Sequence, residues 1–168
     1  LLAAEARAIQ AGGADFLLIG TNTMHKVAPE IEAAIDIPLL HIADATAHRL
    51  QADGVTRVGL LGTRFTMEQD FYKGRLQERF GLEVLVPDDA ARERVHRIIY
   101  DELCLGDIRE SSQAEYLAII ADLAQTGAQA VILGCTEIAL LVGACQAAVP
   151  LYDTTAIHAE AAVTLALA

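Results

Sequence analysis

The sequence predicts an α/β protein with two pseudo-symmetric lobes, each built from a parallel sheet flanked by helices, and an active site between them. Short apolar runs alternate with helical patterns along the 168 residues, and 54% of the residues are hydrophobic, as expected for parallel strands covered on both faces. The stretch Gly13–Lys26, GADFLLIGTNTMHK, is also a near copy of Gly127–Leu140, GAQAVILGCTEIAL. Aligning the copies places Thr21 on Cys135, so two equivalent strand ends each carry a nucleophile-type side chain.

The first part of the chain predicts three helices and two strands. Gly12 and Gly13 end the first helix, and Pro29 suits the first turn of a helix because its missing N–H needs no partner there. A continuous apolar run marks the first strand. We expect, in order, a helix over Leu1–Gln10, a strand over Asp15–Ile19, a helix over Met24–Ile35, a strand over Ile37–Leu40 and a helix over Asp44–Gln51.

The rest of the chain continues the alternation. Gly81 and Gly106 end two of its helices, and Ser111 is expected to cap a third. We expect strands over Arg57–Leu61, Glu83–Val86, Ala130–Leu133 and Val149–Tyr152, and helices over Met67–Phe80, Ala90–Leu105 and Ser111–Thr126, after Cys135 and from Ala156. Right-handed crossovers then bring all strand carboxyl ends to one edge, where open α/β sheets bind ligands.

A change of sequence neighbourhood near Asp53-Gly54 predicts the division between the lobes. We expect residues 1–53 to be the remainder of an N-terminal lobe, residues 54–152 to form a C-terminal lobe, and residues 153–168 to form a helix returning to the first lobe. The sequence does not start with Met and opens on what reads as the latter part of a helix. We therefore expect the first strands of the N-terminal lobe to be missing, in an N-terminally truncated chain.

Composition disfavours several function classes. The formal net charge is −11 with no Lys/Arg block, whereas phosphate-rich partners need clustered positive charge; we expect no nucleic-acid or membrane partner. The three cysteines form no CxxC pair, and an odd number argues against a disulfide framework, which favours a reducing cytoplasm. The five histidines show no metal-ligand spacing, so we expect no metal site.

Cys135 is the strongest candidate for chemistry. It follows a buried strand and Gly134, which we expect to allow a sharp backbone turn, and it precedes a predicted helix N-terminus. Such a position lowers the pKa of a thiol and favours thiolate. The alternative is a small buried hydrophobe, the commoner role of cysteine, and spacing alone leaves both open.

The other candidates are hydroxyl and amide side chains. Thr21 is a weak base, and a threonine at a strand-to-helix turn is most often only a helix N-cap. Asn22 and Thr23 could bind a carboxylate together with backbone amides of the helix start. Thr63 and Thr66 repeat this arrangement at the first strand of the second lobe, where capping explains them almost as well.

Cys104 and Cys145 have apolar helical surroundings, so we expect both in the core. His158 follows a good helix cap, and for it we favour a structural role.

Five motifs resemble the aspartate/glutamate racemase family along essentially the whole chain. They are GTNTMHK, LHIADAT, LLGTRFTMEQDFY, GAQAVILGCTEI and DTTAIHAEAAV. The resemblance implies a two-lobed α/β enzyme, usually a homodimer, that inverts the α-carbon of a small acidic amino acid without pyridoxal phosphate, metal or another cofactor. Most of the family carries two cysteines, and here Thr21 replaces the first, as in its L-specific branch.

The resemblance also implies roles for individual residues. Cys135 would remove the α-proton of L-Asp or L-Glu, and Thr21 would serve the opposite face. Asn22, Thr23 and Thr136 match positions that hold the substrate's carboxylate and amino groups, and Thr63 and Thr66 are carried over with them. Recognition of the side-chain carboxylate stays open, since Cys104 stands about where aspartate racemases commonly have a Lys.

Two other functions remain possible from the sequence. A single usable cysteine also suits the related arylmalonate decarboxylases, which protonate a carbanion from one face after losing carbon dioxide. A chain without the family's N-terminal Gly-rich strand could instead be a non-catalytic or incomplete ligand-binding protein. Chirality change and carbon dioxide release distinguish the first alternative from a racemase.

Overall fold

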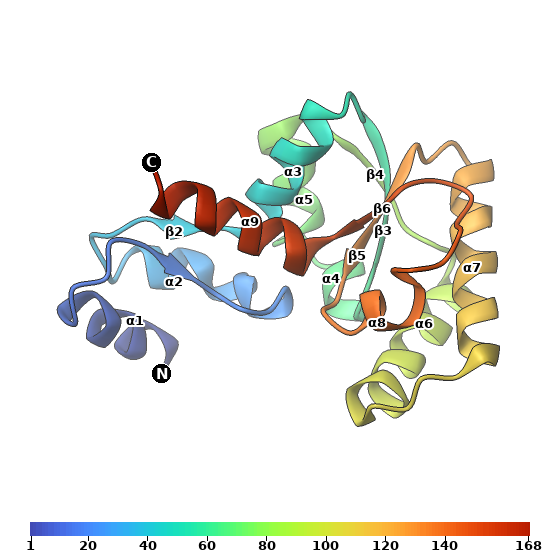
Figure 1. Cartoon of the computed structure of the whole chain (residues 1–168), viewed down its shortest axis with the longest axis horizontal. Helices are drawn as coiled ribbons and strands as arrows, with labels where there is room; N and C mark the ends of the chain where they lie inside the picture. Colours follow the sequence, from blue (N-terminus) through green and yellow to red (C-terminus); the bar gives the residue numbers. More distant parts are fainter.

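A computed structural model describes residues 1–168 and confirms the predicted fold class, an α/β fold with two parallel sheets flanked by helices (Figure 1). One sheet has two strands in the order β1-β2, and the other has four in the order β4-β3-β5-β6, all parallel. The strands are β1 (Leu17–Leu18), β2 (Leu39–Leu40), β3 (Arg57–Gly62), β4 (Glu83–Leu85), β5 (Ala130–Gly134) and β6 (Leu151–Asp153).

Helices connect and cover the strands, as a parallel sheet requires. The α-helices are α1 (Leu2–Ala11), α2 (Ala28–Glu32), α3 (Ile42–Ala52), α4 (Arg64–Glu68), α5 (Lys73–Phe80), α6 (Asp89–Asp101), α7 (Glu110–Gln125), α8 (Ile138–Val142) and α9 (Thr154–Ala166). Two 3₁₀ segments, η1 (Thr23–Val27) and η2 (Leu103–Leu105), complete the set. No helix has both the length and the apolar character that crossing a membrane requires.

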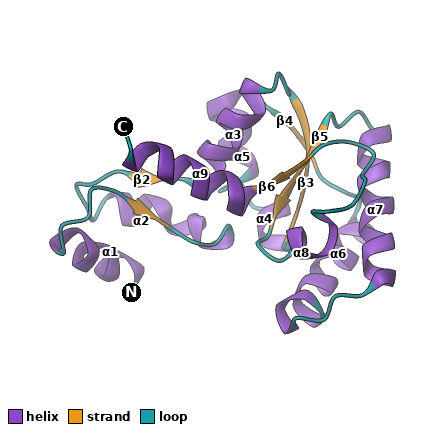
Figure 2. Cartoon of the chain, viewed as in Figure 1, coloured by secondary structure: helices purple, strands orange, loops and turns teal.

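The four-stranded sheet is covered on both faces (Figure 2). One face packs against α6, α7 and α8 in a core that includes Val95 and Tyr116. The opposite face packs against α3, α5 and α9 in a core that includes Leu50 and Leu76. Alternate residues of β5 enter opposite cores, which explains why this strand is apolar throughout.

The two-stranded sheet forms a smaller lobe with α1 and α2. Its core contains only three buried apolar residues, Ala6, Leu17 and Ile31, so it depends on contacts with the rest of the chain. Helix α9 lies between this lobe and the larger sheet (Figure 1). The His158 ring of α9 bonds through Nε2 to the Leu40 carbonyl of β2 at 2.8 Å, a structural contact between the lobes.

Helix α3 packs with the larger sheet, although it precedes the expected division near Asp53-Gly54. Its buried side chains Ala47 and Leu50 share a core with Val58 and Leu60 of β3. The domain ranges drawn from the sequence therefore remain a prediction, and core packing alone would assign α3 to the larger lobe.

Several predicted helices are divided in the structure. The helix expected over Met24–Ile35 is η1 followed by α2, because Pro29 lacks a backbone N–H and starts a new helix. The helix expected over Met67–Phe80 breaks after Glu68, where Gln69 is extended and Tyr72 enters the core. Ser111 does not cap α7, which begins at Glu110 without a side-chain cap.

Candidate active site

The carboxyl ends of β1, β3 and β5 meet around a cavity of about 280 Å³. The strand ends β3 and β5 lie side by side because Gly62 pairs with Gly134 in the parallel register. The cavity is lined by Thr21, Asn22, Thr23, Met24, Thr63, Ile99, Tyr100, Cys104, Gly134, Cys135, Thr136 and Glu137. Segments from both lobes therefore face one another across a single cavity.

Six of the seven site residues expected from the sequence line this cavity: Thr21, Asn22, Thr23, Thr63, Cys135 and Thr136. Thr66 does not line it. Its side chain is fully buried beneath Thr63, and the two hydroxyls lie 3.2 Å apart. Thr66 supports Thr63 rather than facing the cavity.

Gly134 is required for a different reason from the one expected. It ends β5 with ordinary backbone angles rather than in a sharp turn with positive φ. A Cβ at this position would lie 2.9 Å from the Leu61 carbonyl oxygen and 3.3 Å from Thr66 Cγ2. The glycine therefore permits the close approach of β3 and β5 beneath Cys135. At Gly20, by contrast, a Cβ would have no neighbour within 4 Å.

Cys135 does not have the lowered pKa that its sequence position predicted. Burial, together with the neighbouring Glu137 carboxylate, raises the pKa of the thiol to about 12. Sγ donates a hydrogen bond to Glu137 Oε2 at 2.9 Å. The helix beyond it, α8, starts only at Ile138 and has five residues, so it contributes little dipole at the sulfur.

Glu137 is a site residue that the sequence predictions did not include. Its Oε2 accepts hydrogen bonds from Cys135 Sγ and from Thr136 Oγ1, the latter at 2.7 Å. Burial alone would raise its pKa, but these two donors outweigh burial and the pKa is lowered. A carboxylate thus accepts the hydrogen bond of the thiol and favours the protonated sulfur. Its position two residues after Cys135 was the available signal.

The Thr21 loop is held by a buried histidine. His25 Nε2 lies 3.2 Å from the Ile42 backbone N–H and accepts from it, so the ring proton is on Nδ1, which donates to the Thr21 carbonyl at 2.8 Å. Burial lowers the pKa of His25 to about 4, which keeps the ring neutral. The ring also packs against His41 in a tilted arrangement, with a centroid distance of 4.3 Å and an interplanar angle of 58°.

Two hydroxyl contacts connect the loop after β1 to the larger lobe. Thr23 Oγ1 lies 3.3 Å from Thr63 Oγ1. Asn22 Nδ2 donates to Thr154 Oγ1 at 3.0 Å, whereas Asn22 Oδ1 is buried with no hydrogen-bond partner. An unpartnered buried acceptor is costly, so this oxygen retains an unused capacity to accept a hydrogen bond.

The cavity lining also includes Met24, Ile99, Tyr100 and Cys104. Cys104 is exposed, which corrects the expectation that it lies in the core: the preceding helix α6 ends at Asp101, and η2 turns the thiol outward. No Lys or Arg lines the cavity, and Glu137 is its only charged lining residue. No group of three or more His, Cys, Asp and Glu side chains is arranged to hold a metal ion.

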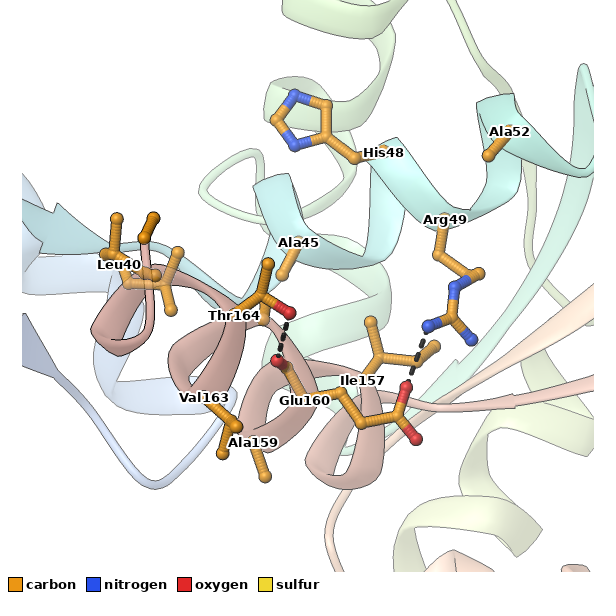
Figure 3. Close-up of a pocket in the computed structure, with 13 residues that line it drawn as sticks. Leu40, Ala45, His48, Arg49, Ala52, Ile157, Ala159, Glu160, Val163 and Thr164 are labelled. Atoms are coloured by element: carbon orange, nitrogen blue, oxygen red, sulfur yellow. Dashed lines mark hydrogen bonds and ion pairs between the residues drawn. The ribbon is translucent and has the colours of Figure 1, made fainter.

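A larger groove of about 990 Å³ lies elsewhere, between α3 and α9. Figure 3 shows Arg49 of α3 reaching Glu160 of α9, an exposed ion pair of 2.7 Å. Its walls are mostly apolar, and none of the expected site residues lines it. Size alone therefore does not identify the site; the convergence of strand ends and polar groups does.

Comparison with known proteins gives consistent matches. The family model for Asp/Glu/hydantoin racemases matches residues 1–162. The chain is 56% identical to a candidate Asp/Glu racemase of known structure from Yersinia pestis, with a TM-score of 0.95, covering 99% of this chain and 73% of that one. It is 34% identical to an aspartate racemase homologue from Pyrococcus horikoshii OT3, with a TM-score of 0.89 and the same coverage.

A curated relative extends the comparison. The broad specificity amino-acid racemase RacX of Bacillus subtilis (strain 168) is 27% identical over 156 residues, 93% of this chain. The chain spans 66% of the length of that relative.

Proposed function

The chain belongs to the Asp/Glu/hydantoin racemase family, and from this premise we propose that it carries the catalytic site of a cofactor-independent amino-acid racemase. The proposed substrates are L-Asp and L-Glu, inverted by removal and return of the α-proton. One observation carries the proposal: Thr21 and Cys135, from related loops of the two lobes, line the same cavity. Racemisation needs proton-transfer groups on opposite faces of one carbon.

The proposed mechanism assigns each group a step. Cys135 thiolate takes the α-proton of the L-substrate, and Thr21, directly or through water, returns a proton on the other face. Asn22 Oδ1, the buried acceptor without a partner, accepts from the substrate ammonium group. Thr23 and Thr63 offer hydroxyl donors to the α-carboxylate from the cavity lining. Thr136 would join them by redirecting the hydroxyl that donates to Glu137 Oε2.

Substrate binding would also activate the thiol. With a pKa of about 12, Cys135 is almost wholly protonated at neutral pH. An ammonium group entering the cavity places positive charge near a buried sulfur, which lowers the pKa of that thiol. The proton leaving Sγ has a nearby acceptor in Glu137 Oε2, to which it is already hydrogen-bonded. We therefore propose that Glu137 relays this proton from Sγ to solvent and does not retain it, since its own pKa is lowered.

The chemical difference between Thr21 and Cys135 affects individual kinetic constants but not their ratio kcat/KM. The two enantiomers are equal in free energy, so kcat/KM must be the same in both directions. The asymmetry can appear only in kcat and KM separately, and in the rate at which each enantiomer first exchanges its proton. We expect the L-enantiomer to exchange faster, since a thiolate is the better base.

The decisive experiment follows α-proton exchange of L-Asp and L-Glu in deuterated water, in a single turnover. We expect exchange by the wild-type protein and none by Cys135→Ala. Exchange retained in Cys135→Ala would refute the assignment of the base. Carbon dioxide release from an arylmalonate without chirality change of an amino acid would instead favour the decarboxylase alternative. The homodimer and the reducing compartment expected from the sequence remain proposals.

A second candidate is the same reaction on amino acids with neutral side chains. It is favoured by the lining, where Glu137 supplies the only charge and Met24, Ile99, Tyr100 and Cys104 bring no cation. A side-chain carboxylate would meet no positive partner there, and an unpaired buried charge is costly. Comparing exchange of L-Glu with that of L-Gln, which has the same shape, separates the two candidates.

A further inference from the structure

We propose that Thr154 is a positioning residue that fixes which end of the Asn22 amide is presented to the substrate. The inference rests on the proposed racemase function and adds a residue that neither touches the reacting atoms nor lines the cavity. Thr154 opens α9, directly after β6, and its side chain is fully buried. It is 132 positions from Asn22 in the sequence, yet their side chains are in contact.

The hydrogen bonds at Thr154 have only one consistent direction. Its hydroxyl lies 2.9 Å from the Leu133 carbonyl oxygen, which can only accept, so the hydroxyl proton is used there. The same oxygen must then accept from its second neighbour, Asn22, whose Nδ2 lies 3.0 Å away. The NH₂ group of Asn22 therefore faces Thr154.

The opposite orientation of the amide is disfavoured by the same chain of contacts. Rotating the Asn22 amide by half a turn would set Oδ1 against a hydroxyl oxygen whose proton is already donated, two acceptors facing each other in a buried site. An unmet buried acceptor costs the desolvation of that group. Thr154 thus leaves Oδ1 of Asn22 as the free acceptor, the atom without a partner in the structure.

This orientation has a chemical consequence for recognition. A carbonyl-type oxygen accepts from an ammonium group and opposes a carboxylate, whereas an NH₂ group does the reverse. Thr154 accordingly makes Asn22 select the α-ammonium end of the substrate. Because Leu133 immediately precedes Gly134 and Cys135 in the chain, the same link sets the position of the Asn22 loop relative to the base.

The test compares three threonine variants of the intact chain. Thr154→Val keeps the shape and removes the hydroxyl, and Thr154→Ser keeps the hydroxyl. Thr164→Val is the matched control, because Thr164 lies on the same helix and its exposed hydroxyl bonds only to the Glu160 carbonyl. We expect α-proton exchange to fall by about 10- to 100-fold in Thr154→Val, to stay within about 3-fold in Thr154→Ser, and to be unchanged in Thr164→Val.

A double-mutant cycle separates positioning from general destabilisation. If Thr154 acts through Asn22, then Thr154→Val causes no further loss of exchange in an Asn22→Ala background, whereas a general effect on folding would add to it. Additive losses would overturn the proposal, as would Thr154→Val behaving like wild type while Cys135→Ala is inactive.

Binding provides a readout that does not depend on turnover. Calorimetry would measure the affinities of L-Glu and glutarate, and those of L-Met and its desamino acid. The members of each pair differ only in the ammonium group. We expect Thr154→Val to weaken the binding of the amino acid by about 10-fold or more. The binding of the desamino acid should hardly change. If wild type shows no exchange, the proposed function fails while this comparison still decides the role of Thr154. Equal weakening of both members of a pair, or no binding of either amino acid to wild type, would overturn it.

Discussion

Replacing Glu137 by Gln should make the Cys135 thiol more acidic. The variant keeps the size of the side chain and an acceptor oxygen near Sγ, but it removes the negative charge. Burial is the largest cause of the raised pKa, and the hydrogen bond and charge of Glu137 follow it. The pKa of Cys135 should therefore fall below about 12, toward the ordinary value of 9.0 without reaching it, since the site stays buried.

The size of the effect follows from the ionised fraction. Each unit by which the pKa falls raises the thiolate concentration about tenfold at a pH well below the pKa. If the pKa fell from about 12 all the way to 9.0, the thiolate concentration at pH 8 would rise by about 1,000-fold. Because burial persists, we expect the lower part of this range, an increase of about 10-fold or more in the rate of alkylation by iodoacetamide.

The assay requires that only Cys135 reacts. Cys104 is exposed and Cys145 is partly exposed, so both are replaced by Ser, and the adduct is located by mass spectrometry. Glu160→Gln is the matched control, because Glu160 lies on α9 and pairs with Arg49 away from the cavity. An alkylation profile in Glu137→Gln that is unchanged, or shifted to higher pH, would refute this account of the thiol.

Three further predictions concern the loops and the histidines. Gly134→Ala should destabilise the fold by about 2 kcal/mol in chemical denaturation, because its Cβ meets a carbonyl oxygen at 2.9 Å, whereas Gly20→Ala should change little. Thr21→Val should still release the α-proton of the L-substrate into solvent but form the D-enantiomer far more slowly, as followed by exchange and chiral chromatography. Burial lowers the pKa of His25 to about 4 and of His41 to about 3. Their contribution to stability is therefore present above pH 6.5 and is lost as the pH falls toward those values, because the unfolded chain binds more protons.

Each of these predictions has a result that would contradict it. Equal stability of Gly134→Ala and Gly20→Ala would mean that the two strands separate easily at the site. Complete loss of L-exchange in Thr21→Val would show that Cys135 cannot act alone on that enantiomer. For the histidines, urea unfolding of His25→Gln should show a shallower loss of stability between pH 7 and pH 5 than wild type; the same slope in both would exclude His25 as a contributor.

Much of the fold follows from local sequence patterns. Glycines at helix ends, apolar strand runs and the repeated copy around Thr21 and Cys135 predict the order of elements, and the family match supports the same fold. The errors fall where tertiary contacts override local preference. Tyr72 enters the core by interrupting a helix that its neighbours favour, and Cys104 is turned outward by a 3₁₀ segment. The hydrophobic periodicity of the sequence predicts neither the break in the helix before Tyr72 nor the exposure of Cys104.

By itself the sequence predicted that Thr21 and Cys135 follow related strands, because strand ends and glycines are short-range features. Only the tertiary structure decided how those residues behave. The pKa of Cys135 depends on burial and on Glu137, and the orientation of Asn22 depends on Thr154, which lies far along the chain. Local spacing places nucleophilic groups, whereas desolvation and hydrogen-bond direction depend on which distant atoms surround them.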